Sequence, residues 1–378
     1  MLAKLPPLGW NSWNTFGENI SEQLICETAD AMVDLGYRDA GYEYVVIDDC
    51  WSLRDRDENG RIVPDPVKFP HGMKYVADYV HSKGLKFGMY SCAGILTCAG
   101  YPSSYDHEFV DAQTFAEWGV DYLKYDFCNF PANGNCKKRY NRMSMALKAS
   151  GRPILFSACN WGVQEPWSWM ASAGVHMYRS TGDINDSFKS FTDIAMSQID
   201  KLSMSRSGCF NDPDMLIVGM YGKGNVAFGG CNDEEYRSHF AMWCMMGVPL
   251  MMGGDIRSLN DVSRNLLQNK GLLAIDQDEE CRPPFIVTSN GKRHFLVKHL
   301  ANNEFALAYF NFDDRDLKNG FSFVCPFDDF GLPYESGFGL ELTDAITGEY
   351  IGVKRDHYCP DNIPAHGCRV LRGKLVRV

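Results

Sequence analysis

The stretch VDYLKYDFCN, residues 120–129, decides the fold of this chain. It starts as an apolar strand and ends on Lys124 and Asp126, which stand two positions apart and therefore point to the same face of a strand. A strand that is apolar until its last residues is typical of a buried parallel sheet. The charged pair at its carboxyl end indicates a site at the edge where such strands finish.

The same alternation of a short apolar strand with an amphipathic helix continues from the start of the chain to about residue 281. The predicted strands are PLGW (7–10), YVVIDD (44–49), KFGMYS (86–91), YLKYDF (122–127), PILFSA (153–158), MYRSTG (177–182), SGCFND (207–212) and PLMMGG (249–254). The predicted helices are 21–35, 71–83, 108–118, 136–149, 192–204, 234–246 and 264–274. Ser21 is the expected N-cap of the first helix and Gly36 its stop. Eight such units predict a closed (β/α)₈ TIM barrel over residues 1–281.

The remaining residues, 282–378, contain strand-like segments separated by turns and no long amphipathic helix. Asn290 and Gly291 form a typical two-residue hairpin turn between two of these segments. This pattern predicts a C-terminal antiparallel β-sandwich. The segment holds no cluster of acids and bases, so its expected role is structural support, with accessory sugar binding as the alternative.

The composition narrows the class of ligand. The chain has 378 residues with a formal net charge of -11, and its pI is near 5.3. Nucleic acids and anionic membranes need a basic surface, so both are excluded as partners and a neutral ligand is expected. No apolar run is long enough for a membrane span, and MLAKLPPLGW lacks the pattern of a signal peptide. We therefore expect a soluble cytoplasmic protein, or a secreted one if a leader has been removed; a homo-oligomer remains open.

The chain has fourteen cysteines, several of them inside apolar runs where a free thiol behaves as a small hydrophobe. One or two disulfides under loops are the alternative interpretation, and they would require an oxidising compartment. The spacing of His357, Cys359, His366 and Cys368 matches no standard zinc site. We expect no metal there.

Polar residues gather where the predicted strands end, at the rim on which barrel sites are built. They are Trp10, Trp13, Asp48, Asp49, Tyr90, Cys92, Lys124, Asp126, Cys159, Trp161, Arg179, Asp183, Asp212, Asp214 and Asp255. Most are aspartates or aromatic residues, and none belongs to a glycine-rich phosphate-binding loop. This combination predicts a pocket for a polyol.

Crowded carboxylates allow one acid to be protonated while another is ionised, as glycoside hydrolysis requires. Lys124 would keep Asp126 ionised, so Asp126 is the candidate nucleophile. Asp183 follows Arg179 across a short loop and is the candidate acid/base.

Several structural alternatives stay open at this point. Asp48 and Asp49 could be a helix cap and its neighbour, and the two cations could form purely structural ion pairs with their acids. The acids could also be ligands of a metal-dependent barrel enzyme, and a sugar-binding barrel without catalysis would present similar residues.

Six motifs in this order resemble glycoside hydrolase family 27, the melibiase-like α-galactosidases: GWNSWNTF, VIDDCW, GMYSCAGILTCAGYPSS, YLKYDFCN, RSTGDI and NDPDMLIVG. The segment IPAHGCRVLR extends the resemblance to the C-terminal part. The resemblance implies Asp126 as nucleophile and Asp183 as acid/base of a retaining enzyme that needs no metal or cofactor. It implies sugar contacts from Trp13, Asp48, Asp49, Tyr90, Lys124, Cys159, Arg179 and Asp214. Cys98, Asn160 and Trp161 are further candidate binding residues. It also implies a disulfide between Cys98 and Cys128.

The implied activity is the release of terminal α-linked D-galactose from oligosaccharides or glycoconjugates. Asp48 and Asp49 match two aspartates of the family. In its members these aspartates bind the 4- and 6-hydroxyls of the sugar. This chain departs from the pattern at Asn160, where α-galactosidases commonly carry glutamate near the sugar's 2-position. The closest rival activity is therefore that of an α-N-acetylgalactosaminidase.

Overall fold

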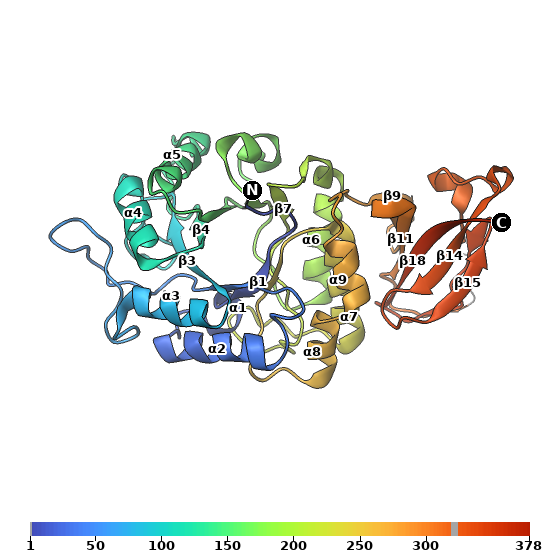
Figure 1. Cartoon of the computed structure of the whole chain (residues 1–378), viewed down its shortest axis with the longest axis horizontal. Coiled ribbons are helices and arrows are strands. Elements are labelled where there is room, and N and C mark those ends of the chain that lie inside the picture. The colour runs from blue at the N-terminus through green and yellow to red at the C-terminus, as the bar shows by residue number, and fades with distance from the viewer. Residues whose placement is uncertain (1, 319–323) are drawn as a thin grey trace. The chain divides into compact units, whose positions relative to one another are not determined.

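The computed structural model describes residues 2–318 and 324–378, and its central element is a sheet of eight parallel strands (Figure 1). The strands are β1 (Leu8–Asn11), β2 (Tyr44–Val46), β3 (Lys86–Cys92), β4 (Tyr122–Asp126), β5 (Leu155–Cys159), β6 (Met177–Arg179), β7 (Phe210–Asp212) and β8 (Leu250–Met252). Their order in the sheet is β7-β6-β5-β4-β3-β2-β1-β8. All eight predicted strands are confirmed.

The segment after β7 joins the two ends of this sheet. The Leu216 amide donates to the Met251 carbonyl at 2.8 Å, and the Gly253 amide donates to the Leu216 carbonyl at 2.9 Å. These bonds connect the β7 side to β8, so the eight strands curl into the predicted barrel. Its interior is filled by large side chains from several strands, namely Tyr44, Val46, Tyr122, Leu155, Met177 and Met251.

Helices α2 (Glu22–Asp34), α3 (Gly72–Ser82), α4 (Glu108–Trp118) and α5 (Cys136–Ala149) follow β1 to β4 in turn and match the predicted helices closely. A short helix, α1 (Trp13–Phe16), precedes them. The Ser21 side chain accepts a hydrogen bond from the Leu24 amide, which confirms it as an N-cap. Gly36 follows at φ 84°, a backbone conformation that suits glycine.

Two of the later helices differ from the prediction. The helix predicted over 192–204 begins earlier, as α6 (Phe188–Gln198), because Ser187 caps it, and its last turns form a 3₁₀ helix over Ile199–Met204. The last predicted helix is broken into α8 (Asp261–Leu267) and α9 (Lys270–Asp276). Asn269 accepts from the Leu272 amide and starts a new helix, which periodicity alone did not reveal. Helix α7 (Asp233–Met246) agrees with the prediction.

The C-terminal part contains the predicted antiparallel strands, drawn in orange to red in Figure 1. The six-stranded sheet has the order β15-β14-β18-β11-β10-β9. Its strands are β9 (Phe285–Ser289), β10 (Arg293–Leu300), β11 (Glu304–Asn311), β14 (Phe338–Asp344), β15 (Tyr350–Lys354) and β18 (Cys368–Arg377). Two ribbons pair β12 (Leu317–Lys318) with β17 (Asn362–Ile363) and β13 (Cys325–Pro326) with β16 (His357–Tyr358). A hairpin turn forms close to the predicted place, but its two central residues are Gly291 and Lys292, since the Asn290 amide donates to the Arg293 carbonyl and Ser289 pairs with His294.

One apolar core joins the large sheet to the ribbons. It includes Phe295, Leu307, Leu340 and Leu371 from the sheet together with Leu317, Tyr358 and Ile363 from the ribbons. The C-terminal strands therefore have the two packed layers of a sandwich.

By compactness the chain divides into two units. The first is Met1–Asp186, Ser207–Gly230 and Pro249–Asn260, and the second is Ser187–Arg206, Cys231–Val248 and Asp261–Val378. The domain boundary between residues 281 and 282 stays a prediction. Among the described residues, no helix combines the length and the apolar composition needed to cross a bilayer.

Candidate active site

A pocket opens at the carboxyl ends of the barrel strands, within the first compact unit. The predicted residues that line it are Trp13, Asp48, Asp49, Tyr90, Cys98, Lys124, Asp126, Trp161, Arg179, Asp183 and Asp214. They come from strand ends and loops between residues 13 and 214. Acids that are far apart in the sequence thus lie in one pocket, because parallel barrel strands end at the same rim.

Asp126 is the last residue of β4 and is almost fully buried. Its carboxylate accepts from the Phe127 amide at 2.8 Å and from the Tyr90 hydroxyl at 3.2 Å. Burial raises the pKa of Asp126, and the charge of Lys124 lowers it, with burial the larger effect. Burial also raises the pKa of Tyr90 well above its ordinary value, so this hydroxyl remains a donor to the carboxylate.

Asp48 and Asp49 follow β2 and are both held rigidly. Asp48 Oδ2 accepts from Lys124 Nζ at 2.7 Å and from Asn11 Nδ2 at 2.8 Å. Asp49 Oδ2 accepts from the Ala99 amide at 2.9 Å. Two adjacent buried carboxylates with fixed orientations are suited to accept hydrogen bonds from sugar hydroxyls.

Arg179 ends β6 and binds two carboxylates. Its Nη2 donates to Asp183 Oδ1 at 2.6 Å, and its Nη1 lies 2.9 Å from Asp214 Oδ1. Arg179 is buried, whereas the Asp183 side chain is 73% exposed. Desolvation by the surrounding protein raises the pKa of Asp183, but the charge and hydrogen bond of Arg179 lower it by more, so this carboxyl is held ionised.

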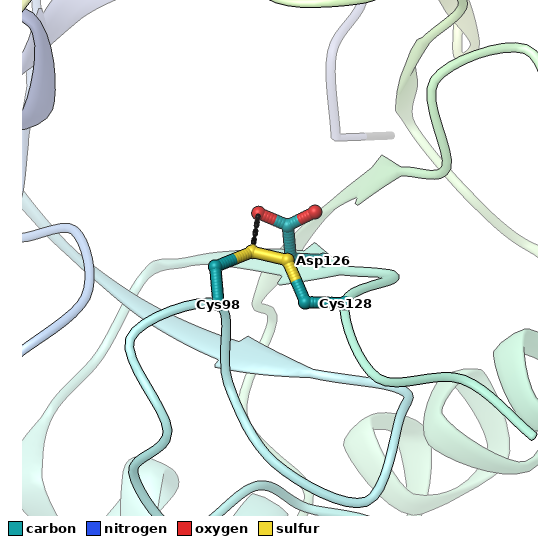
Figure 2. Close-up of side chains that lie close together, drawn as sticks. All are labelled: Cys98, Asp126 and Cys128. Carbon is teal, nitrogen blue, oxygen red and sulfur yellow. Dashed lines mark hydrogen bonds between the residues drawn. A yellow bond between two sulfur atoms is a disulfide. The ribbon is translucent and has the colours of Figure 1, made fainter.

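The predicted disulfide between Cys98 and Cys128 is confirmed, with the two Cα atoms 4.9 Å apart. Figure 2 shows the carboxylate of Asp126 beside the sulfur–sulfur bond, with its Oδ2 3.6 Å from Cys98 Sγ. Gly94 makes this close approach of two loops feasible, since a Cβ there would lie 1.8 Å from the Cys128 carbonyl oxygen. The three groups cluster as metal ligands can, but sulfurs joined in a disulfide offer no thiolate.

Two predicted contact residues lie outside this pocket. Cys159, at the end of β5, instead lines a small adjoining cavity that shares Lys124, Arg179, Asp214 and Met215 with the pocket. Asn160 is fully buried, and its Nδ2 donates to the Val163 carbonyl at 2.5 Å, so its side chain folds back onto its own loop. The next residue, Trp161, faces the pocket from this loop with a backbone φ of 56°.

The geometry is that of an acidic pocket at the carboxyl ends of the barrel strands, and a comparison with known families identifies the chain. The model of the alpha galactosidase A family matches residues 5–278. The chain belongs to the alpha galactosidase A family.

Members of the family resemble this chain over most of its length. An alpha-galactosidase of Cyamopsis tetragonoloba is 46% identical over 311 residues, which are 82% of this chain and 73% of that protein. Alpha-galactosidase A of Cellvibrio japonicus (strain Ueda107) is 40% identical and covers 98% of this chain and 92% of its own. The structure of a Saccharomyces cerevisiae alpha-galactosidase with raffinose superposes with a TM-score of 0.90 at 29% identity, covering 99% of this chain and 98% of that one.

Three pocket residues of this alpha galactosidase A family member were not predicted, namely Asn14, Met215 and Val226. Val226 belongs to the loop YGKGNVAFGG, which lies far from any predicted strand end. Asn11, which holds Asp48, was also missed. The signal for Asn11 was present, because it directly follows the strand PLGW and is the first polar residue at that strand end.

Proposed function

We propose that this chain hydrolyses terminal α-linked galactosides with retention of configuration, with Asp126 as nucleophile and Asp183 as acid/base. The observation that carries the proposal is that both carboxylates line one pocket in different environments, one buried and one exposed beside a cation. Retaining glycosidases need two such carboxylates, one to attack the anomeric carbon and one to transfer protons. Family membership supports the same assignment.

Asp126 is prepared for attack on the anomeric carbon. Its Oδ1 is held by the Phe127 amide and its Oδ2 by the Tyr90 hydroxyl, so the carboxylate is oriented before the sugar enters. Burial removes water that would otherwise solvate the nucleophile. The attack forms a galactosyl ester on Asp126 and breaks the bond to the leaving oxygen.

Asp183 must alternate between two protonation states. Paired with Arg179 it is ionised, which suits the second step, where it takes a proton from the attacking water. In the first step it must donate a proton to the leaving oxygen, so the carboxyl has to turn away from Arg179. Its exposure, and the open space around Gly182, leave room for that rotation.

The proposed substrate is an α-galactoside oligosaccharide or glycoconjugate rather than an α-N-acetylgalactosaminide. The structural neighbour from Saccharomyces cerevisiae was solved with raffinose, an α-galactoside. The loop of Asn160 and Trp161 corresponds to the part of the family site near the sugar's 2-position. Trp161 projects its large ring into the pocket and leaves less room for an acetamide than a small residue would.

Azide rescue of two variants tests both roles. An Asp126→Ala variant should be inactive on 4-nitrophenyl α-galactoside and should form β-galactosyl azide with added azide, because azide then replaces the missing nucleophile. An Asp183→Ala variant should form α-galactosyl azide, since azide attacks the covalent intermediate from the opposite face. Initial release of β-galactose by the unaltered enzyme in NMR, or near-normal activity of the Asp126 variant, would refute the proposal.

A further inference from the structure

We propose that Asp212 is a positioning residue, which fixes Asp214 in the sugar pocket and, through Asp214, the loop that carries Asp183. The inference rests on the function proposed above. It concerns a carboxylate that does not line the sugar pocket and that the two-carboxylate mechanism does not use.

Asp212 is the last residue of β7 and is only 7% exposed. It is in register with Arg179 on the neighbouring strand β6, so both side chains point to the same face of the sheet. Together with Lys124 and Asp214 they line a small cavity of about 20 Å³ that adjoins the pocket. Asp212 thus lies behind the sugar-binding groups and not among them.

The backbone of Asp214 explains what Asp212 does. Asp214 has a φ of 114°, a region that residues with a side chain rarely adopt and that persists only where surrounding contacts enforce it. Asp212 Oδ1 accepts a hydrogen bond from the Asp214 amide at 3.0 Å, across the rigid Pro213. Asp212 therefore closes a turn around a strained residue.

This turn aims Asp214 at two groups of the proposed site. Asp214 Oδ1 lies 2.9 Å from Arg179 Nη1, and Asp214 Oδ2 accepts from the Ile184 amide at 2.8 Å. Ile184 directly follows Asp183. A second bond, from the Thr181 hydroxyl to the Pro213 carbonyl at 2.8 Å, ties the same two loops together. A shift of the turn would consequently move both a sugar contact and the acid/base.

The ionisation of Asp212 fits this task. Burial raises the pKa of Asp212 to about 6, with Arg179 acting in the opposite direction, so the group is mostly a carboxylate at neutral pH. An ionised acceptor forms a stronger hydrogen bond to an amide than a neutral one does.

The test uses leaving groups of different quality. A dinitrophenolate departs without a proton, whereas the sugar leaving group of raffinose needs one from the acid. In the full-length enzyme, Asp212→Ala should raise KM about tenfold for both 2,4-dinitrophenyl α-galactoside and raffinose, and should lower kcat about tenfold more for raffinose. Asp212→Asn, whose amide oxygen still accepts from the Asp214 amide, should stay within about threefold of the unaltered enzyme at pH 7.

Asp344 offers a matched control, because it is a buried aspartate that accepts the Ile346 and Thr347 amides at 2.8 Å and does not line the pocket. Asp344→Ala should lower the melting temperature and leave the ratio of the two kcat values unchanged. If Asp212→Ala does not yield folded protein, Asp212→Leu replaces it, since a leucine side chain fills similar space and offers no acceptor to the Asp214 amide.

Two outcomes overturn the positioning role. One is unchanged kinetics, and the other is an equal loss of kcat for both substrates with unchanged KM, as in a purely structural defect. Asp183→Ala is measured in parallel and should lose far more activity on raffinose than on the dinitrophenyl substrate. If it does not, the proposed function fails and the inference fails with it; if it does and the Asp212 variants show no such difference, only the inference fails.

Discussion

Lys124 Nζ lies 2.7 Å from Asp48 Oδ2, so the cation of β4 forms its ion pair with an acid that follows β2. The sequence predicted that Lys124 would act on Asp126, two positions along the same strand. In the structure Lys124 acts on two acids, one through a direct bond and the other through its charge alone. Lys124 bonds directly to Asp48, while its charge lowers the pKa of Asp126 against the larger opposing effect of burial.

Replacing Lys124 with methionine should therefore have two consequences. Asp48 would remain as a buried carboxylate without its cation, which should lower the free energy of unfolding by about 3 kcal/mol. The pKa of Asp126 should rise, because an opposing cation is lost, so the fall in kcat/KM on acidification should begin at a higher pH. Urea unfolding and the pH dependence of kcat/KM measure the two effects.

The double variant Lys124→Met with Asp48→Asn is the control for stability. It removes both partners, so part of the lost unfolding free energy should return. An acidic limb that stays at the same pH in the single variant would contradict the electrostatic role given to Lys124.

The disulfide between Cys98 and Cys128 closes a loop of 30 residues in sequence separation. Replacing both cysteines with alanine should lower the free energy of unfolding by about 3 to 4 kcal/mol, because the unfolded chain gains freedom. The loop of Cys98 also supplies the Ala99 amide that orients Asp49. KM for raffinose should therefore rise more than kcat falls, which steady-state kinetics can separate.

The buried thiol of Cys92 provides a comparison for this variant. It is a free cysteine whose Sγ donates to the Cys128 carbonyl at 3.3 Å. Cys92→Ala should cost less stability than loss of the disulfide, since it releases no covalent constraint. Equal destabilisation by both changes would contradict the constraint argument.

Trp161 is expected to determine the preference at the sugar's 2-position. Trp161→Ala should raise kcat/KM for 4-nitrophenyl α-N-acetylgalactosaminide relative to the galactoside by about tenfold, because the removed ring leaves space for the acetamide. Asn160→Ala should not change the ratio, since that side chain points away from the pocket. An unchanged ratio in the Trp161 variant would assign the discrimination to another part of the pocket.

Local patterns were sufficient to predict the barrel strands, because each is a short apolar run bounded by polar residues at one end. The same feature located the pocket acids, since the carboxyl ends of parallel strands meet at one rim. These local patterns did not predict which acid forms the ion pair with Lys124. Lys124 has Asp126 nearby in sequence, yet its ion pair crosses to β2, and only the register of the sheet determines this.

Loop conformation accounts for the remaining differences. Asn160 and Trp161 stand side by side in sequence, and a left-handed backbone at Trp161 decides which of them faces the pocket. Val226 enters the pocket from a glycine-rich loop that has no regular period. The break between α8 and α9 depends on a side-chain cap at Asn269, which competes with continuing the helix.

His239 of α7 gives a prediction for acid stability. It is fully buried, and the centroid of its ring lies 4.2 Å from that of the Trp243 ring. Burial lowers the pKa of His239 to about 3. The unfolded chain binds a proton near pH 6.5, where the folded protein does not. The stabilisation is therefore complete above about pH 6.5 and is lost as the pH falls towards 3.

Replacing His239 with leucine should remove this dependence. The difference in unfolding free energy between pH 7 and pH 4 should be smaller in the variant by about 3 kcal/mol, measured by urea unfolding at both values. Phe191→Leu loosens the same cluster without removing a titrating group, so it should lower stability similarly at both pH values. If His239→Leu and the unaltered protein lose the same stability on acidification, the buried imidazole is not the source of the acid sensitivity.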